Sequence, residues 1–331
     1  QLELALWLES DRMRSLKITP ENLKNQKEAV KEEKRLSYDN QAYWPALLKM
    51  DEMVFRNWAN SHSSIGSMED LDAASINEVK QFFNTYYAPN NAVLAVAGDI
   101  DPAQAEALVR KYFGTIPRQS SPPPIDVSEP EAAAKAKSAT TDPLAQVPAL
   151  AIAWKIPARN SADFYPIALL KSMLFDGESA RVYRALVKEK ELAIEVTGTL
   201  EARRGPGQVA VLAVHKATIR PEAVEALIEA EITRVKNEGV GAPELYKVKN
   251  QYRLARFATG SEGEFSSLQT PLGRALALAE FTMFDGDPSL INSDIDRYLA
   301  VTPEQIREAA RRYFGVANRS VLYIRPAKGK P

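Results

Sequence analysis

The chain has 331 residues, of which 45% are hydrophobic, so it is long enough to fill two ordinary domain cores. Its 42 basic and 43 acidic residues give a formal net charge of −1, which argues against a surface that binds nucleic acid or an anionic membrane. It contains no cysteine, which excludes disulfides, thiolate metal sites and cysteine nucleophiles. The sequence holds no run of about 18 apolar residues, so it predicts no membrane span.

The first third of the chain is predicted to be mainly helical. Apolar residues recur on one face across residues 1–16, which is typical of an amphipathic helix. A second helix is indicated by Thr19 as N-cap and Pro20 at the first helical position. We expect further helices within 67–87 and over 102–112, separated by a turn at 89–91 and a strand over 92–97.

The composition changes at residues 118–148, which include three consecutive prolines and a stretch rich in Ala, Lys, Ser and Thr without aromatic residues. The predicted organisation is therefore a first domain over 1–117, a linker over 118–144 and a second domain over 145–331. In the second domain the pattern predicts strands at 149–154 and 208–215, helices at 164–174, 221–237 and 242–258, and a flexible or substrate-side loop at 260–263.

The sequence contains an internal repeat. Residues 75–96, SINEVKQFFNTYYAPNNAVLAV, are similar to residues 302–323, TPEQIREAARRYFGVANRSVLY, at an offset of 227. The tripeptide Lys-Asn-Gln also occurs at both 24–26 and 249–251, at the nearly equal offset of 225. Two matches in the same order, with similar offsets and similar expected secondary structure, predict a duplicated domain.

The repeat also predicts the size of the first half. About 110 residues separate the end of the linker near 145 from residue 258, the position that pairs with Glu33 at the offset of 225. Only 32 residues precede Glu33. By symmetry, we expect roughly 80 residues to be missing from the front of the first half.

Few residues of the kind that carry catalysis are present. There are two histidines, without a His-x-x-x-His spacing, and no Gly-x-Ser-x-Gly motif. His215 lies in an apolar strand pattern and is expected to be a buried or half-buried structural residue. His62 lies in the polar run Asn-Ser-His-Ser-Ser and is expected to be solvated or to pin a loop. Neither is predicted to bind a metal.

Residues 25–35, NQKEAVKEEKR, resemble the helix that carries the third zinc ligand in the M16 family of metallopeptidases, the pitrilysin-like and insulinase-like enzymes. The flanking segments are similar to the family as well, upstream at 2–13 and downstream at 86–92 through Gly98 and Asp99. In the second half, SARVYRAL at 179–186 is similar to a family signature, so the resemblance covers essentially the whole chain.

The resemblance implies a role for Glu33 as a zinc ligand. A carboxylate on a helix would complete a site of two histidines and one glutamate, with one position left for water. In this family an inverted His-x-x-Glu-His helix supplies the histidines and the general base. That helix is expected upstream of Gln1, so no catalytic residue is visible and the chain as written cannot hold catalytic zinc. Outside this family context, the run Glu-Glu-Lys-Arg at 32–35 would be read as a solvated turn of helix.

Three further positions depart from the family pattern. Gln26 stands where many relatives carry a second glutamate, and its amide could hydrogen-bond a zinc ligand. Val187 and Ile194 stand where relatives often carry the arginine and tyrosine that grip the substrate and stabilise the oxyanion. Both are expected to be packed apolar side chains, and a partner subunit could supply the lost pair.

The resemblance implies an α+β fold of two homologous M16-type half-domains, with the first half truncated. Each half would have an antiparallel-rich sheet with helices packed on one side, and the two would face each other like a clamshell. The expected function is that of a Zn²⁺-dependent endopeptidase subunit acting on peptides or unfolded polypeptides. The alternative is a non-catalytic M16-like subunit that binds peptide or scaffolds a complex.

The resemblance also implies a partner and a location. A second M16-type subunit is expected, in a heterodimer or homodimer. By analogy with bacterial relatives, the protein is expected in the periplasm or to be secreted, with a cytoplasmic location as the alternative.

Overall fold

The computed structural model describes residues 1–257 and 267–327, which form two compact units. Unit 1 comprises residues 1–34, 65–125 and 255–292, and unit 2 comprises residues 35–64, 126–254 and 293–331. The predicted loop at 260–263 lies outside the described residues. Within the described ranges, no helix is both long and apolar enough to span a membrane.

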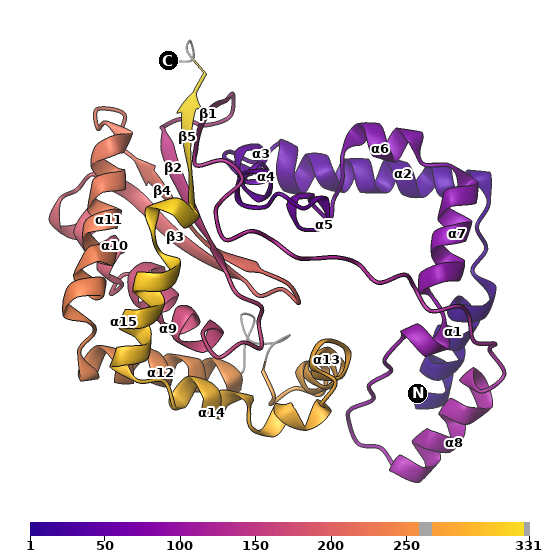
Figure 1. Ribbon diagram of the computed structural model, residues 1–331. Helices are drawn as coiled ribbons and strands as arrows, with labels where there is room; N and C mark the ends of the chain where they lie inside the picture. Colours follow the sequence, from indigo (N-terminus) through magenta and orange to yellow (C-terminus); the bar gives the residue numbers. More distant parts are fainter. Residues whose placement is uncertain (258–266, 328–331) are drawn as a thin grey trace. The chain divides into compact units, whose positions relative to one another are not determined.

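Unit 2 is built on a five-stranded sheet in the order β1-β5-β2-β4-β3 (Figure 1). Strand β1 pairs with β5 in parallel, and every other neighbouring pair is antiparallel. The sheet is therefore antiparallel-rich, as expected. The strands are β1 (Lys137–Asp142), β2 (Ala149–Ile156), β3 (Ala193–Glu201), β4 (Gly207–His215) and β5 (Arg319–Pro326).

The central strand β2 is buried on both faces, which explains its almost continuous apolar sequence. Its alternate residues Leu150, Ile152 and Trp154 belong to the main core with helices α9 (Phe164–Phe175), α11 (Pro221–Glu238) and α15 (Pro303–Tyr313), which cover one face of the sheet (Figure 1). The opposite face is covered by the short helices α3 (Trp44–Leu47) and α4 (Met50–Val54), which pack on the alanines of β2. The α+β class is confirmed, and the second covered face was not predicted.

Unit 1 is helical in its described part. Its α-helices are α1 (Leu2–Ser15), α2 (Pro20–Lys34), α6 (Met68–Ala73), α7 (Ile76–Tyr86), α8 (Pro102–Phe113) and α13 (Pro271–Glu280). Polar contacts join them: Lys111 Nζ, on α8, lies 2.7 Å from Glu3 Oε1, on α1. Both clusters of buried hydrophobic residues found in the described chain lie in unit 2.

The remaining elements are short or lie between the main ones. The α-helices are α5 (Trp58–Ser61), α10 (Arg181–Tyr183), α12 (Ala242–Phe257) and α14 (Asp294–Leu299). The π-helical and 3-10 turns are η1 (Arg35–Asp39), η2 (Pro89–Asn91), η3 (Arg184–Glu189), η4 (Phe281–Asp285), η5 (Pro288–Asn292) and η6 (Val316–Asn318).

One local prediction is wrong, and one predicted segment contains an element that was not expected. Residues 92–97 are extended but form no strand, since no described segment of unit 1 supplies a neighbouring strand for a hydrogen-bonded ladder. The predicted linker, 118–144, contains strand β1, whose composition is polar because it is an edge strand with alternating exposure. A strand of this kind lacks the apolar run by which β2 was recognised.

The repeated segments share their local structure. Helices α7 and α15 each have 11 residues and begin with a capping box, Ser75 with Glu78 and Thr302 with Gln305. Each is followed by a 3-10 turn whose asparagine donates back to the last tyrosine of the helix. Asn91 Nδ2 lies 2.9 Å from the Tyr86 carbonyl, and Asn318 Nδ2 lies 2.8 Å from the Tyr313 carbonyl. This match supports the interpretation of the repeat as a duplication.

Candidate functional site

Glu33 lies in the last turn of helix α2, where Thr19 Oγ1 accepts a hydrogen bond from the Asn22 backbone N–H at the start of the helix. The side of α2 toward α6 is held by lysines: Lys27 Nζ donates to the Asp72 carbonyl at 3.1 Å, and Lys31 pairs with the Asp72 carboxylate. Glu33 is exposed and makes no hydrogen bond or ion pair with any described residue. Its carboxylate is therefore available to a ligand.

Gln26 is also exposed on α2. It precedes Glu33 by seven residues, which is close to two turns of helix, so both side chains project from the same face. The predicted zinc ligand and the predicted amide therefore share one face of α2, about 10 Å apart along the helix axis.

The described residues do not hold zinc by themselves. Structural and catalytic zinc sites use three or four protein ligands, and no group of three or more His, Cys, Asp or Glu side chains in residues 1–257 and 267–327 has metal-binding geometry. Glu33 would supply one ligand of the expected set.

The two histidines occupy structural positions. His215 ends strand β4 and is fully buried; its Nδ1 lies 3.1 Å from the Lys216 carbonyl, and Nε2 finds no hydrogen-bond partner in the described part of the chain. Burial lowers the pKa of His215, so the imidazole is held neutral. His62 is exposed, stacks on Trp58 with ring centroids 4.0 Å apart, and lies with Nδ1 2.6 Å from the Trp58 carbonyl. Each histidine thus lies in the kind of environment that was predicted.

Val187 and Ile194 lie in different environments. Val187, in η3, is partly buried and packs against the main core, as predicted. Ile194 was also expected to be packed, but it is 53% exposed. A register shift between Ala193 and Glu195 leaves Ile194 without a partner in the ladder of β3 with β4, and this bulge turns its side chain outward.

A buried ion pair in unit 2 was missed by the sequence analysis. Lys155 lies in β2 with its side chain 6% exposed, and its Nζ lies 3.2 Å from Glu129 Oε2 and 2.8 Å from the Pro130 carbonyl. Glu129 also accepts hydrogen bonds from the backbone N–H groups of Arg56 and Asn57. A lone lysine within an apolar strand was the signal, because a buried charge requires a counter-charge.

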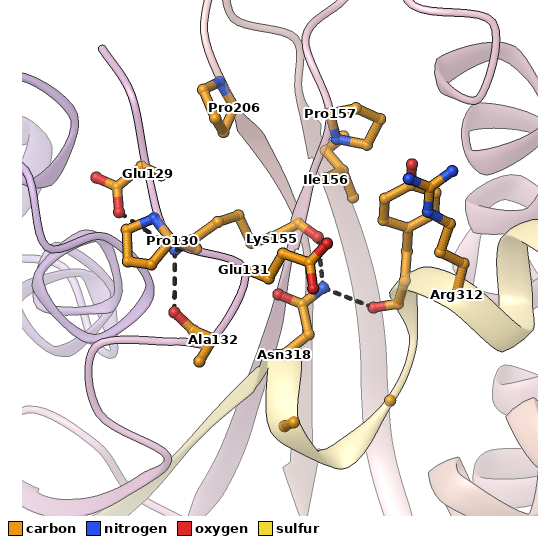
Figure 2. A pocket seen from close by; sticks show the side chains of 13 residues that line it. Glu129, Pro130, Glu131, Ala132, Lys155, Ile156, Pro157, Pro206, Arg312 and Asn318 are labelled. Carbon is orange, nitrogen blue, oxygen red and sulfur yellow. Dashed lines mark hydrogen bonds and ion pairs between the residues drawn. The ribbon is translucent and has the colours of Figure 1, made fainter. Parts of the chain in front are cut away.

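A cavity of about 410 Å³ opens beside this ion pair (Figure 2). Its walls come from the segment 129–132, the end of β2, the β3–β4 turn and the end of α15 with the following turn η6. This volume lies within the range of small-molecule and peptide side-chain pockets. The lining includes Pro130, Pro157, Pro206, Glu131, Tyr313 and Asn318.

A second cavity of unit 2, of about 550 Å³, contains a perturbed carboxylate. Burial raises the pKa of Asp51 to about 6, against the opposing charge of Arg203, whose guanidinium lies 3.0 Å from Asp51 Oδ1. Arg203 is itself shared with Glu201 and the Asn60 carbonyl. These contacts tie the β3–β4 turn to helices α4 and α5.

The chain is similar to bacterial proteins named zinc proteases. It is 21% identical to zinc protease PqqE of Helicobacter pylori over 329 residues, which cover 98% of this chain and 72% of that protein. It is 27% identical over 152 residues to an uncharacterized zinc protease of Mycobacterium leprae, covering 45% of this chain and 34% of that protein.

Solved structures share the fold. A protease from Helicobacter pylori has a TM-score of 0.88 at 21% identity and covers 98% of this chain, which spans 76% of that structure. A peptidase M16 inactive domain from Pseudomonas fluorescens has a TM-score of 0.81 at 16% identity, with 99% of this chain and 76% of that structure covered. The family described as "Peptidase M16 inactive domain" matches residues 73–252, more than half of the chain. This protein therefore belongs to the M16 peptidase family.

Proposed function

We propose that this chain is part of a zinc-dependent endopeptidase subunit that hydrolyses peptides or unfolded polypeptides. The observation that carries the proposal is Glu33, an exposed carboxylate without a partner among the described residues, on the helix whose sequence resembles the zinc-ligand helix of the family. A metal ligand needs a carboxylate that no cation of its own fold has already neutralised. The similarity to proteins named zinc proteases supports the same function.

In this proposal, the two histidine ligands and the general base come from the His-x-x-Glu-His helix that the family resemblance implies. Gln26, on the same face of α2 as Glu33, would orient a ligand through its amide. Val187 and Ile194 leave the second half without the arginine and tyrosine seen in relatives, so we also propose that a second M16-type subunit completes the substrate groove.

A second function is favoured by one observation. The family match over residues 73–252 is described as the inactive domain of M16 peptidases, and it includes both Val187 and Ile194. A non-catalytic subunit that binds peptide or scaffolds a peptidase complex would need neither position.

The two functions are separated by Glu33→Gln in the full natural protein. Gln keeps the size of the side chain but removes the charge that zinc requires, so we expect the zinc content and the peptidase activity to fall together by at least tenfold. Zinc is measured by elemental analysis and activity with a quenched fluorescent peptide.

Glu28→Gln is the matched control, because Glu28 lies on the same helix and pairs with Lys31 at 3.2 Å on the surface. It should leave both quantities unchanged. If the Glu33→Gln protein bound zinc as well as the parent protein does, Glu33 would not be a zinc ligand. A natural protein that contains no zinc and cleaves no peptide would support the scaffold function instead.

A further inference from the structure

Most of the side-chain hydrogen-bond donors that line the cavity beside Lys155 are already bonded to other groups of the protein (Figure 2). Lys155 Nζ makes contacts of 2.8 to 3.2 Å with Glu129 Oε2 and the carbonyls of Pro130 and Ala132, which engage its three protons. Asn318 Nδ2 donates to the carbonyls of Lys155 and Tyr313 at 2.7 and 2.8 Å, which engages both of its protons.

The remaining walls add few donors. The Tyr313 hydroxyl donates to Asp163 Oδ2 at 2.6 Å. Pro130, Pro157 and Pro206 have no backbone N–H and present apolar rings. Among the lining side chains, only that of Arg312, which is 67% exposed, keeps donors free, and its guanidinium already lies 3.0 Å from Asp163 Oδ2.

Acceptors, in contrast, are left over. The Glu131 carboxylate lines the cavity, is exposed, and makes no hydrogen bond or ion pair with any described residue. Asn318 also lines the cavity, and its buried Oδ1 atom has no hydrogen-bond partner in the described chain. The side chains of this cavity therefore favour a ligand that donates hydrogen bonds over one that accepts them.

The charges lead to the same conclusion. Lys155 is neutralised by Glu129, and Arg312 is neutralised by Asp163, with the distances given above. Glu131 remains as the one uncompensated charge among the described residues that line the cavity. Its field reaches the cavity wall, because Glu131 is one of the groups that help burial and Asp163 to raise the pKa of Tyr313 to about 12.

We infer that this cavity binds a primary ammonium group, which a polypeptide presents at the end of a lysine side chain or as its N-terminal amine. The ammonium donates to Glu131, and the aliphatic part of the residue that carries it packs against the proline rings, in the way that lysine side chains cover apolar surface. This inference rests on the proposed function only in taking the ligand to be a polypeptide. It involves no zinc and no bond cleavage.

The test is a binding measurement with the full natural protein and short fluorescent peptides, in the presence of a chelator so that hydrolysis does not consume them. A peptide with one lysine and a blocked N-terminus reports the side chain. A norleucine peptide with a free N-terminus reports the terminal amine. An acetyl-lysine peptide with a blocked N-terminus has neither ammonium and should bind at least tenfold more weakly than the better of the other two.

Glu131→Gln should weaken binding of the better ligand about tenfold and remove most of its dependence on salt. Glu304→Gln, which removes an exposed carboxylate of α15 outside the cavity, should leave the affinity unchanged. If the acetyl-lysine peptide bound as tightly as the better of the other two peptides, or if the Glu131→Gln and Glu304→Gln proteins bound with equal affinity, the inference would be overturned. Because these measurements use neither zinc nor activity, their failure is distinct from failure of the zinc-ligand proposal.

Discussion

Lys155 shows how one residue can hold an irregular segment to a sheet. Burial lowers the pKa of Lys155, and the hydrogen bond to Glu129 opposes this shift. Burial alone would raise the pKa of Glu129, but hydrogen bonds from Arg56, Asn60, Asn57 and Lys155 hold it below its usual value. The pair stays ionised because each charge is matched by the other. Through Lys155 and the backbone N–H groups of Arg56 and Asn57, Glu129 holds its own segment against β2 and the loop between α4 and α5.

Glu129→Gln is expected to lower the free energy of unfolding by about 3 kcal/mol, because it leaves the Lys155 ammonium buried without a counter-charge. Urea denaturation of the purified protein measures the loss. The double variant Glu129→Gln with Lys155→Met should lose less than the sum of the two single variants, since it removes both charges together. Additive losses would show that the two side chains do not act as a pair.

His215 makes stability depend on pH. Its folded-state pKa lies below the unfolded value, so below about pH 6.5 the unfolded chain binds more protons and is favoured. The stability that neutral His215 provides is complete above the unfolded pKa and declines as the pH falls through it. We expect His215→Gln to reduce the difference in the free energy of unfolding between pH 7.5 and pH 5, measured by urea denaturation at both values.

His62 provides the control, as the other histidine of the chain. Its imidazole is exposed, and His62→Gln measures how far the loss of a surface histidine changes the pH dependence of unfolding. If the two variants changed the pH dependence equally, burial of His215 would not be its cause.

At the scale of elements, the repeat provides two helices with the same length and cap in different surroundings. Helix α15 buries Ile306, Ala309 and Ala310 in the core of unit 2, whereas α7 buries none of its residues. Sequence alone could not distinguish them, because both have a strongly amphipathic pattern. The difference lies in what packs against each apolar face.

We expect Thr302→Ala to lower the global free energy of unfolding of unit 2 by about 1 kcal/mol, which is typical of a lost N-cap. Ser75→Ala removes the equivalent cap from α7 and should only increase local opening of that helix. Hydrogen exchange of the helix amides, together with urea denaturation, separates local from global effects. Equal effects of the two substitutions on global unfolding would contradict this difference.

The elements that the sequence predicted well are those whose pattern is set locally. Strands β2 and β4 and helices α9 and α11 follow directly from apolar runs and helical spacing. The strand predicted at 92–97 failed because a strand exists only with a neighbour, which no local pattern reports. Strand β1 was not predicted, because a strand at the edge of the sheet is partly exposed and its sequence is polar.

The candidate site was predictable to a similar extent. Glu33 and Gln26 could be placed on one face from helical spacing alone. The cavity beside Lys155 could not be predicted, since Glu131 and Asn318 are far apart in the sequence and meet only when β5 has joined β2. The unmatched lysine in an apolar strand was the one visible sign that polar residues would gather there.

On the scale of the whole molecule, neither unit is a continuous stretch of chain. Unit 2 takes its residues from three separate segments, and so does unit 1. The two domains predicted from composition, 1–117 and 145–331, are continuous segments and differ from these units, so that division remains a proposal. The chain passes between the units several times, so the folding of one constrains the folding of the other.

The position of β5 determines when the sheet can be completed. It is the last strand among the described residues, yet it lies between β1 and β2. During synthesis one edge of β2 stays unpaired until residues 319–326 have left the ribosome. Exposed apolar edges of this kind favour association between nascent chains. A chain that stopped before β5 would therefore be unable to complete this sheet.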